Sequence, residues 1–217
     1  MSVVTISRLE KSGGKVIGKQ IADRLGYELI TRETIAKIFK DYGIINFKQT
    51  YETPNGIWDY YDTFHAASIG LLKRLHLAFA HYGNVVIVGR GSFATLKDFS
   101  NVLNVRLWAP FDVRVKRYMD TMNVNDPVEA EKLVKEADRT RNAFVKSWFN
   151  ARTDSNDFDL VINTDVVPME ESVSLIVDTV HSMEMRKQDK SKSIDSIDVD
   201  PVLERAVNEL LSAAAVK

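Results

Sequence analysis

The chain has 217 residues, of which 45% are hydrophobic and 27% charged, and this balance is typical of a globular protein with a sizeable core. It contains no cysteine, so disulfides, thiol nucleophiles and thiolate metal sites are excluded. The net charge of −1 gives no general attraction to nucleic acid or to acidic membranes, so any affinity for phosphate must be local.

The beginning of the chain carries no recognisable targeting signal. Residues 1–14 lack the basic start and long apolar run of a secretion signal. No apolar run approaches the roughly 18–20 residues that a membrane span needs. The sequence therefore predicts a cytoplasmic protein that has neither nucleic acid nor a membrane as its partner.

The first predicted unit is a strand, a glycine turn and a helix. Residues 3–6 are a short β-branched run, and the turn follows at Gly13 and Gly14. Apolar residues then recur at helical spacing until Gly26, which supplies a stop. A second short strand is predicted over 27–30.

A helical region with a loop inside it comes next. Thr31 can cap a helix that runs over about 32–41. Residues 43–58 contain the glycine, proline and asparagine that are typical of a loop. Residues 59–82 present one continuous apolar helical face, which predicts a long helix.

Strands and helices keep alternating in the second half of the chain. Residues 85–88 are apolar on both faces, as in a central strand of a parallel sheet. The later predictions are a strand over 103–108, helices over 111–121 and 127–149, a strand over 158–162, and a helix over 168–185. This alternation predicts an α/β fold with a parallel sheet and helices on both of its faces.

The C-terminal part differs in composition from the rest. Residues 186–200 are rich in Lys, Ser and Asp, and they predict a flexible linker after a domain that spans 1–185. Residues 201–217 then predict a short amphipathic helix. Two roles are open for this helix: it could form a homo-oligomer, or it could dock a partner protein.

The turn after the first strand is a candidate phosphate site. A helix that starts after a glycine turn offers free N–H groups and the positive end of its dipole. Residues 7–15 have this layout but do not satisfy the pattern GxxxxGK[ST]. If Ser12-Gly13 is aligned with the usual Ser-Gly, then Gly14 takes the lysine position, Lys15 comes one residue late, and the hydroxyl that binds Mg²⁺ is missing. A plain structural turn is the competing interpretation.

Basic residues supply further candidates at the ends of later strands, where ligands of such sheets bind. Arg90 follows the most apolar strand between two glycines, with room to make a bidentate contact with a ligand. Arg139 and Arg141 fall on the predicted helix over 127–149, and Arg114 and Arg117 on the helix before it. Arginines on a helical lid suit the stabilisation of charge in phosphoryl transfer, but by spacing alone a solvated helix face with ordinary ion pairs is the favoured interpretation of these four arginines. The four histidines have no metal-ligand spacing, so no metal site is predicted.

Several strings together resemble the cytidylate kinase-like family, whose phosphate loop is modified. The strings are, in order, TISRLEKSGGKVIGKQIADRLGY, VIVGRGSFATL, VRLWAPFDVRVKRYM, EADRTRNAFVKSWF and FDLVINTD. The resemblance spans roughly residues 1–182. It implies a P-loop kinase-type three-layer α/β/α sandwich, with a five-stranded parallel sheet, a monophosphate-binding region and a helical lid over about 111–150.

The resemblance also implies roles for particular residues and ligands. It implies ATP as donor with Mg²⁺, and a nucleoside monophosphate as acceptor. The residues matched to the donor are Ser12, Gly13, Gly14 and Lys15 at the phosphates, and Asn163 and Thr164 near the adenine. Those matched to the acceptor and to phosphoryl transfer are Arg90 and Arg32 for the acceptor, Arg139 and Arg141 in the lid, and Asp138 before them.

Three departures from the family pattern bear on the substrate. Gly91 stands where cytidylate kinases carry the aspartate of their GRD motif, Thr31 stands where an aspartate often precedes Arg32, and Lys11 replaces the first loop glycine. The leading hypothesis is an ATP-dependent phosphotransferase acting on a small acceptor. The alternatives are a catalytically impaired nucleotide sensor and a kinase of a non-nucleotide metabolite.

Overall fold

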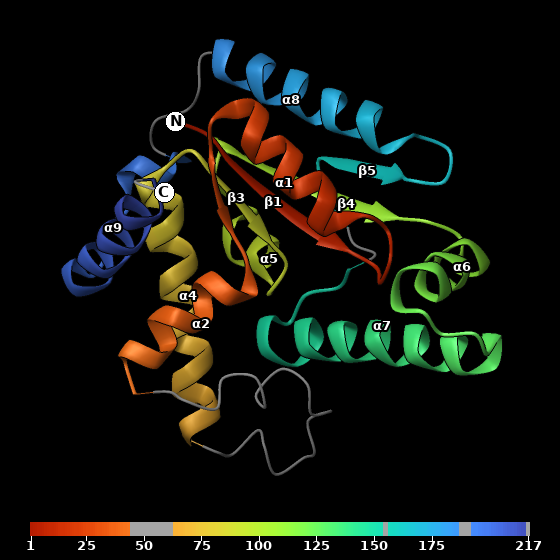
Figure 1. Cartoon of the computed structure of the whole chain (residues 1–217). Coiled ribbons are helices and arrows are strands. Elements are labelled where there is room, and N and C mark those ends of the chain that lie inside the picture. The colour runs from red at the N-terminus through yellow and green to blue at the C-terminus, as the bar shows by residue number, and fades with distance from the viewer. Residues whose placement is uncertain (44–62, 154–155, 187–191, 216–217) are drawn as a thin grey trace.

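The computed structural model describes residues 1–43, 63–153, 156–186 and 192–215, and a parallel sheet forms its centre (Figure 1). The sheet has five strands in the order β2-β3-β1-β4-β5, all paired in parallel. The strands are β1 (Val3–Arg8), β2 (Glu28–Ile30), β3 (Val85–Val88), β4 (Val102–Trp108) and β5 (Leu160–Asn163). The predicted α/β fold with a five-stranded parallel sheet is confirmed.

Helices cover both faces of this sheet. One face packs against α1 (Gly14–Leu25) and α8 (Met169–Met185). The helices on the other face are α2 (Arg32–Asp41), α4 (Thr63–Tyr82), α5 (Ser92–Leu96) and α9 (Pro201–Ala215). Side chains of β1 alternate between the two faces. Val4 and Ile6 pack in the core with α1 and α8, whereas Val3 packs in the core on the other face.

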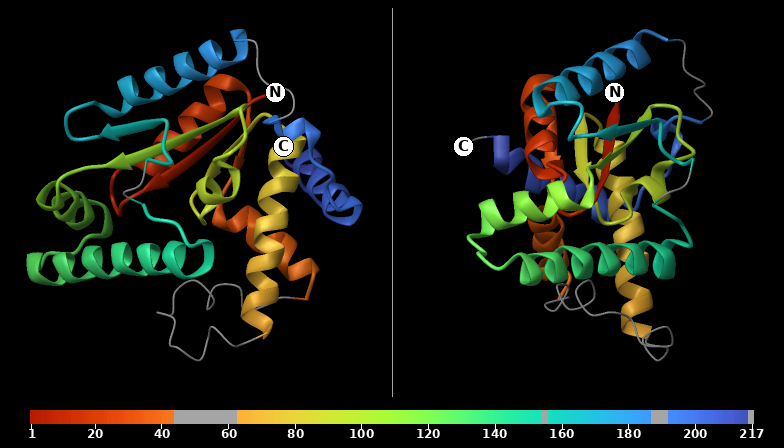
Figure 2. Two further views of the ribbon diagram at one scale, coloured as in Figure 1. Left: turned by 180° about the vertical axis from the view of Figure 1, so that it is seen from behind. Right: turned by 90° about the vertical axis from the view of Figure 1, so that its right-hand side faces the viewer.

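The remaining two helices form a hairpin at one end of the sheet. They are α6 (Phe111–Met122) and α7 (Pro127–Phe149), with a small apolar core of their own around Val115, Ala130 and Val134. Asp126 caps α7, and Pro127 occupies its first turn, where a missing N–H costs nothing. The hairpin lies across the end to which the arrows of β1 and β4 point, and we call it the lid (Figure 2).

Most predicted elements are present, with small shifts at their ends. β1 runs two residues beyond the predicted 3–6, to Arg8. The short helix α5 and the 3₁₀ turn η3 (Ile194–Ser196) were not predicted. The predicted loop over 43–58 and the start of the predicted helix over 59–82 lie almost wholly outside the described residues.

The C-terminal segment is anchored on the domain wherever it is described. In the predicted linker, Ile194 is fully buried, its N–H donates to Asn101 Oδ1 at 2.9 Å, and the N–H of Ser100 donates to Lys192 O. The apolar side of α9 (Leu203, Val207 and Leu211) is buried in the core that it shares with α4. None of the described helices is both long and apolar enough to cross a bilayer.

A buried histidine makes stability depend on pH. His76 in α4 is fully buried, its Nδ1 lies 3.2 Å from Thr95 Oγ1, and burial lowers its pKa to about 3. Below pH 6.5 the unfolded chain takes up a proton that the folded chain does not. Stability is therefore fully present above pH 6.5 and falls as the pH drops toward 3.

We expect this uptake to cost about 2 kcal/mol at pH 5, at 1.36 kcal/mol per pKa unit. Chemical denaturation of the wild type and of His76→Leu between pH 7 and pH 5 measures it, since the variant lacks the titrating group. If the free energy of unfolding changed equally with pH in the two proteins, His76 would not be the group that titrates.

Candidate functional site

The loop between β1 and α1 exposes a row of backbone amides. β1 ends at Arg8 and α1 begins at Gly14, and the residues between them include two in the left-handed region, Lys11 (φ 59°) and Gly13 (φ 83°). Within the described part of the chain, the N–H groups of Lys11, Gly13, Gly14 and Lys15 have no protein acceptor. Such a concave run of amides at a helix N-terminus binds anions.

The bounds of β1 and α1 favour a different register for this loop from the one taken from the sequence. Counting from the end of β1, Gly14 and Lys15 occupy the Gly-Lys positions of GxxxxGK[ST]. Leu9 then replaces the first glycine, and Val16 replaces the hydroxyl residue. In this register the lysine is not displaced, and the missing hydroxyl is the main departure.

The loop contains a lysine whose backbone conformation favours glycine. An L-residue in the left-handed region is disfavoured by about 1–2 kcal/mol. Lys11 Nζ lies 5.1 Å from the centre of the Tyr118 ring in the lid, a contact that offsets part of this cost.

We therefore expect Lys11→Gly to be more stable than Lys11→Ala by about 1 kcal/mol, since both lose the ring contact and only glycine relieves the backbone. Urea denaturation of the two variants measures the difference. Equal midpoints would show that Lys11 is not strained.

A cavity of about 760 Å³ opens beside the loop, and its charges favour an anion. The described residues that line it include six cations and three carboxylates: Arg8, Lys15, Arg32, Arg90, Arg106 and Arg141, against Glu10, Glu33 and Glu136. The lining comes from the ends of β1, β3 and β4, the start of α1 and α2, and the lid. This is the edge of the sheet at which ligands of parallel α/β folds bind.

Four of the predicted site residues meet in this cavity. Lys15, Arg32, Arg90 and Arg141 all line it, although they lie up to 126 positions apart in sequence (15 to 141). Arg90 follows β3 in the left-handed region (φ 59°) between two glycines in the same region. A non-glycine residue held in this conformation at a cavity is typical of a functional position.

Other predicted residues shape the site without lining the cavity. Ser12 is buried, and its hydroxyl donates to the carbonyls of Leu9 and Leu107, so it holds the loop onto β4. Gly13 and Gly14 contribute backbone at the helix start. Arg139 is exposed and lines a separate, shallow depression on α7.

Asn163 and Thr164 lie at the end of β5. Arg117 in α6 donates to Thr164 Oγ1 at 3.0 Å, to Thr164 O at 2.9 Å and to Lys11 O at 3.4 Å. Asn163 Oδ1 accepts from the N–H of Asp165 at 3.1 Å. These bonds join the lid, the loop and β5, and neither Asn163 nor Thr164 lines the cavity described above.

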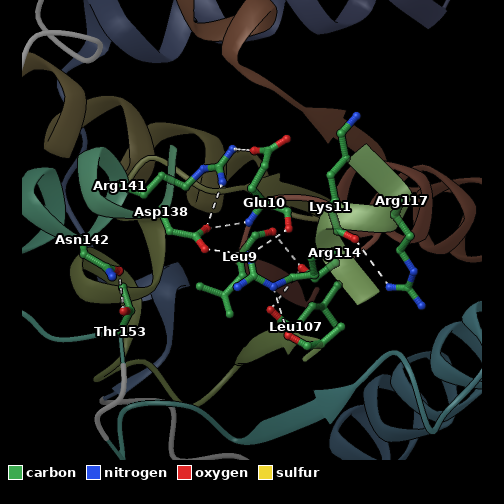
Figure 3. A network of polar contacts seen from close by, with 12 residues as sticks. Leu9, Glu10, Lys11, Leu107, Arg114, Arg117, Asp138, Arg141, Asn142 and Thr153 are labelled. Carbon is green, nitrogen blue, oxygen red and sulfur yellow. Dashed lines mark hydrogen bonds and ion pairs between the residues drawn. The ribbon is translucent and has the colours of Figure 1, made fainter. Parts of the chain in front are cut away.

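A network of charges fastens the lid to the loop (Figure 3). Asp138 Oδ1 accepts the N–H of Glu10 at 2.7 Å, and Asp138 Oδ2 pairs with Arg114 at 2.6 Å. Arg141 pairs with the Glu10 carboxylate. We call these four residues the latch. The latch occupies the Glu10 amide and leaves the amides of Lys11 and of residues 13–15 open.

The cavity lining also contains charged residues that were not in the predicted site, among them Arg8, Glu10 and Arg106. Arg106 is an arginine inside an otherwise apolar strand, and its Nη1 donates to Ser7 Oγ at 2.8 Å. A charged residue in such a strand is itself a signal that sequence reasoning could have used.

The residues present fit the phosphates of ATP better than they fit a metal held by the protein. Open amides and Lys15 suit a polyphosphate. For Mg²⁺, Val16 offers no oxygen, the Ser12 hydroxyl already donates to two carbonyls, and no cluster of three metal-binding side chains occurs among the described residues.

Comparison with solved structures agrees with the fold. An uncharacterized protein from Eubacterium ventriosum superposes with a TM-score of 0.65 at 19% identity, covering 84% of this chain and 99% of that chain. A shikimate kinase from Bacteroides thetaiotaomicron superposes with a TM-score of 0.51 at 14% identity, covering 83% and 98%. At these identities the likeness is one of fold, that of the P-loop kinases. No curated protein sequence matches the chain.

The sequence itself gives the family. Residues 3–166 match the sequence model of the cytidylate kinase-like family. This range includes the loop, the cavity arginines, the latch and the end of β5. This match covers well over half of the chain, and the family is one of kinases that use a nucleotide of the ATP type. The chain belongs to the cytidylate kinase-like family.

Proposed function

We propose that this protein is a phosphotransferase that uses ATP to phosphorylate a small anionic acceptor, with a nucleoside monophosphate as the acceptor. The observation that carries the proposal is the cationic cavity beside open loop amides, with Lys15 and Arg90 in one lining. On this proposal the partner is a small-molecule nucleotide, and the protein works in the cytoplasm.

The roles follow from where each group lies. The loop amides and Lys15 would hold the donor phosphates, and Arg90 with Arg32 would hold the acceptor. An acceptor oxygen forms a bond to the terminal phosphorus of ATP while the bond to the bridging oxygen breaks, and ADP leaves. Little covalent chemistry is asked of the protein, since such catalysis consists of positioning and charge stabilisation.

The test is direct. The purified protein is incubated with ATP, Mg²⁺ and a panel of nucleoside monophosphates, and nucleotide products are separated by ion exchange. We expect a diphosphate from at least one acceptor. ATP binding without transfer to any acceptor would contradict catalysis and favour a second function, that of a nucleotide sensor.

Two observations favour that second function. Val16 stands at the hydroxyl position of the loop, and the carboxylate of Asp138 holds a loop amide. Calorimetry with ATP, read together with the product assay, separates sensor from kinase, since a sensor binds ATP and transfers no phosphoryl group. The glycine at position 91 also leaves a non-nucleotide metabolite as acceptor, so sugars and hydroxy acids belong in the panel.

The two lid arginines should differ in effect. Arg141 lines the cavity, whereas Arg139 faces away on the same helix. We expect Arg141→Gln to lower the transfer rate by roughly tenfold to hundredfold, the usual effect of losing a charge-assisted hydrogen bond. Arg139→Gln should stay near wild type. Equal losses in both variants would mean that Arg139 also reaches the substrate.

A further inference from the structure

The side chain of Arg8 lines the cavity and runs from the start of α1 to Gly89. A Cβ placed on Gly14 would lie 2.8–3.2 Å from the aliphatic carbons of Arg8, so this stem crosses the start of α1. A Cβ placed on Gly89 would overlap Arg8 Nη1. The guanidinium therefore occupies the space left by the missing side chain of Gly89, next to Arg90.

This guanidinium has cations around it and no bonded partner in the described residues. Arg8 donates no side-chain hydrogen bond and forms no ion pair there, although it lines the cavity. Burial, followed by the charges of Arg141 and Arg90, lowers its pKa to about 9, and Glu10 offsets this only in part. Arginine stays protonated at neutral pH even so, and its fork of donors is left for a ligand.

The surroundings determine which ligand fits. The stem lies against the helix start that carries the open amides, and the head lies beside the arginine of the acceptor side. A group with several negative oxygens placed between these two would meet Arg8 and relieve the repulsion among the cations. Phosphoryl oxygens match the guanidinium fork in geometry and charge.

We propose that Arg8 directly binds a phosphoryl group at the junction of the donor and acceptor sides, and that Gly89 is required because a side chain there would displace the Arg8 head. The proposal rests on the proposed function for the identity of the two sides. It adds a ligand-binding residue that comes from the end of β1. The phosphoryl group is either the terminal one of the donor or that of the acceptor.

Calorimetry with Arg8→Gln tests the assignment without any need for turnover. The probes are ATP, ADP and a nucleoside monophosphate, and Arg24→Gln is the matched control at the far end of α1, where Arg24 pairs with Glu170 on the surface. We expect Arg8→Gln to weaken binding by roughly tenfold to hundredfold. If affinity falls for ATP but not for ADP, Arg8 contacts the terminal phosphoryl group of the donor. If affinity falls for the monophosphate, Arg8 contacts the phosphoryl group of the acceptor.

Stability separates a ligand contact from a structural role. Removing a cation from a cationic cluster should leave the unfolding temperature of the ligand-free protein unchanged or raised. A clear drop in that temperature, or probe affinities equal to wild type, would overturn the assignment. Weaker probe binding in Arg8→Gln would support the role of Arg8 even if no acceptor is phosphorylated. The absence of transfer would contradict only the proposed reaction.

A second variant links Gly89 to Arg8. We expect Gly89→Ala to weaken the same probes, because the new methyl group displaces the guanidinium. Adding Gly89→Ala to Arg8→Gln should then cost little further affinity, which a double-mutant cycle measures. Independent, additive losses would show that Gly89 acts through its own backbone and would overturn this part of the proposal.

Discussion

Replacing Lys15 by methionine should lower the rate of phosphoryl transfer by about 10²–10³-fold, the usual effect of losing one group that stabilises transition-state charge. Lys15 is the second residue of α1, is exposed, and lines the cavity beside the open amides. Methionine keeps most of the length and the apolar stem of the side chain and removes the charged ammonium group. The unfolding temperature should therefore stay at the wild-type value.

The chain offers a matched control for this variant. Lys19 lies one turn further along α1 and is exposed, and its ammonium pairs with Asp23 at 2.6 Å on the surface. Lys19→Met removes the same charge from the same helix, and it should transfer phosphate at the wild-type rate. Equal transfer rates in Lys15→Met and Lys19→Met would mean that the donor phosphates bind elsewhere. The loop between β1 and α1 would then have no role in binding them.

This prediction depends on how the loop is aligned with the phosphate-loop pattern, and the sequence alone does not determine that alignment. The string from Lys11 to Lys15 contains two adjacent glycines, so it can be aligned with a phosphate loop in more than one way. Which alignment holds depends on where β1 stops. β1 continues to Arg8 because Ser7 and Arg8 pair with Arg106 and Leu107 of β4, partners that periodicity within a short β-branched run cannot indicate.

The fold was more predictable than the site, and for a physical reason. Strands such as Val85–Val88 are apolar on both faces, and helices such as Pro127–Phe149 carry their own caps, so local sequence determines them. The cavity instead collects side chains from the ends of three strands, the starts of two helices and the lid. Arg90 could be predicted because glycines flank it. Arg106 carries only the weaker signal of a charged residue inside an apolar strand, and the cavity that it lines depends on how the strands pair.

The latch also escaped prediction, because it joins residues that are 128 positions apart (10 to 138). From spacing, Asp138 was only an acidic residue before two arginines. In the structure its carboxylate meets a loop amide and a buried arginine at once. Because each of its oxygens makes one of these contacts, Asp138 joins the lid to the loop.

Asp138→Asn should therefore be the most destabilising single change in the lid. The side chain of Arg114 is 6% exposed and that of Asp138 is 14% exposed, so the substitution leaves a buried guanidinium without its charge partner. Arg114 still donates to the carbonyls of Ala109 and Glu10, which limits the loss. We expect a cost of about 3 kcal/mol, within the range for breaking a buried pair, and a fall of roughly 6–12 °C in the unfolding temperature.

Two further variants show whether the pair itself is responsible. Asp178→Asn on the exposed side of α8 makes the same chemical change and should stay within about 0.5 kcal/mol of wild type. The double variant Arg114→Met with Asp138→Leu removes both charges and should recover much of the loss, since no buried charge is then unpaired. Thermal and urea denaturation of all three measures these differences. If Asp138→Asn costs no more than Asp178→Asn, the latch does not hold the lid, and other contacts such as those of Arg117 with Thr164 and Lys11 do.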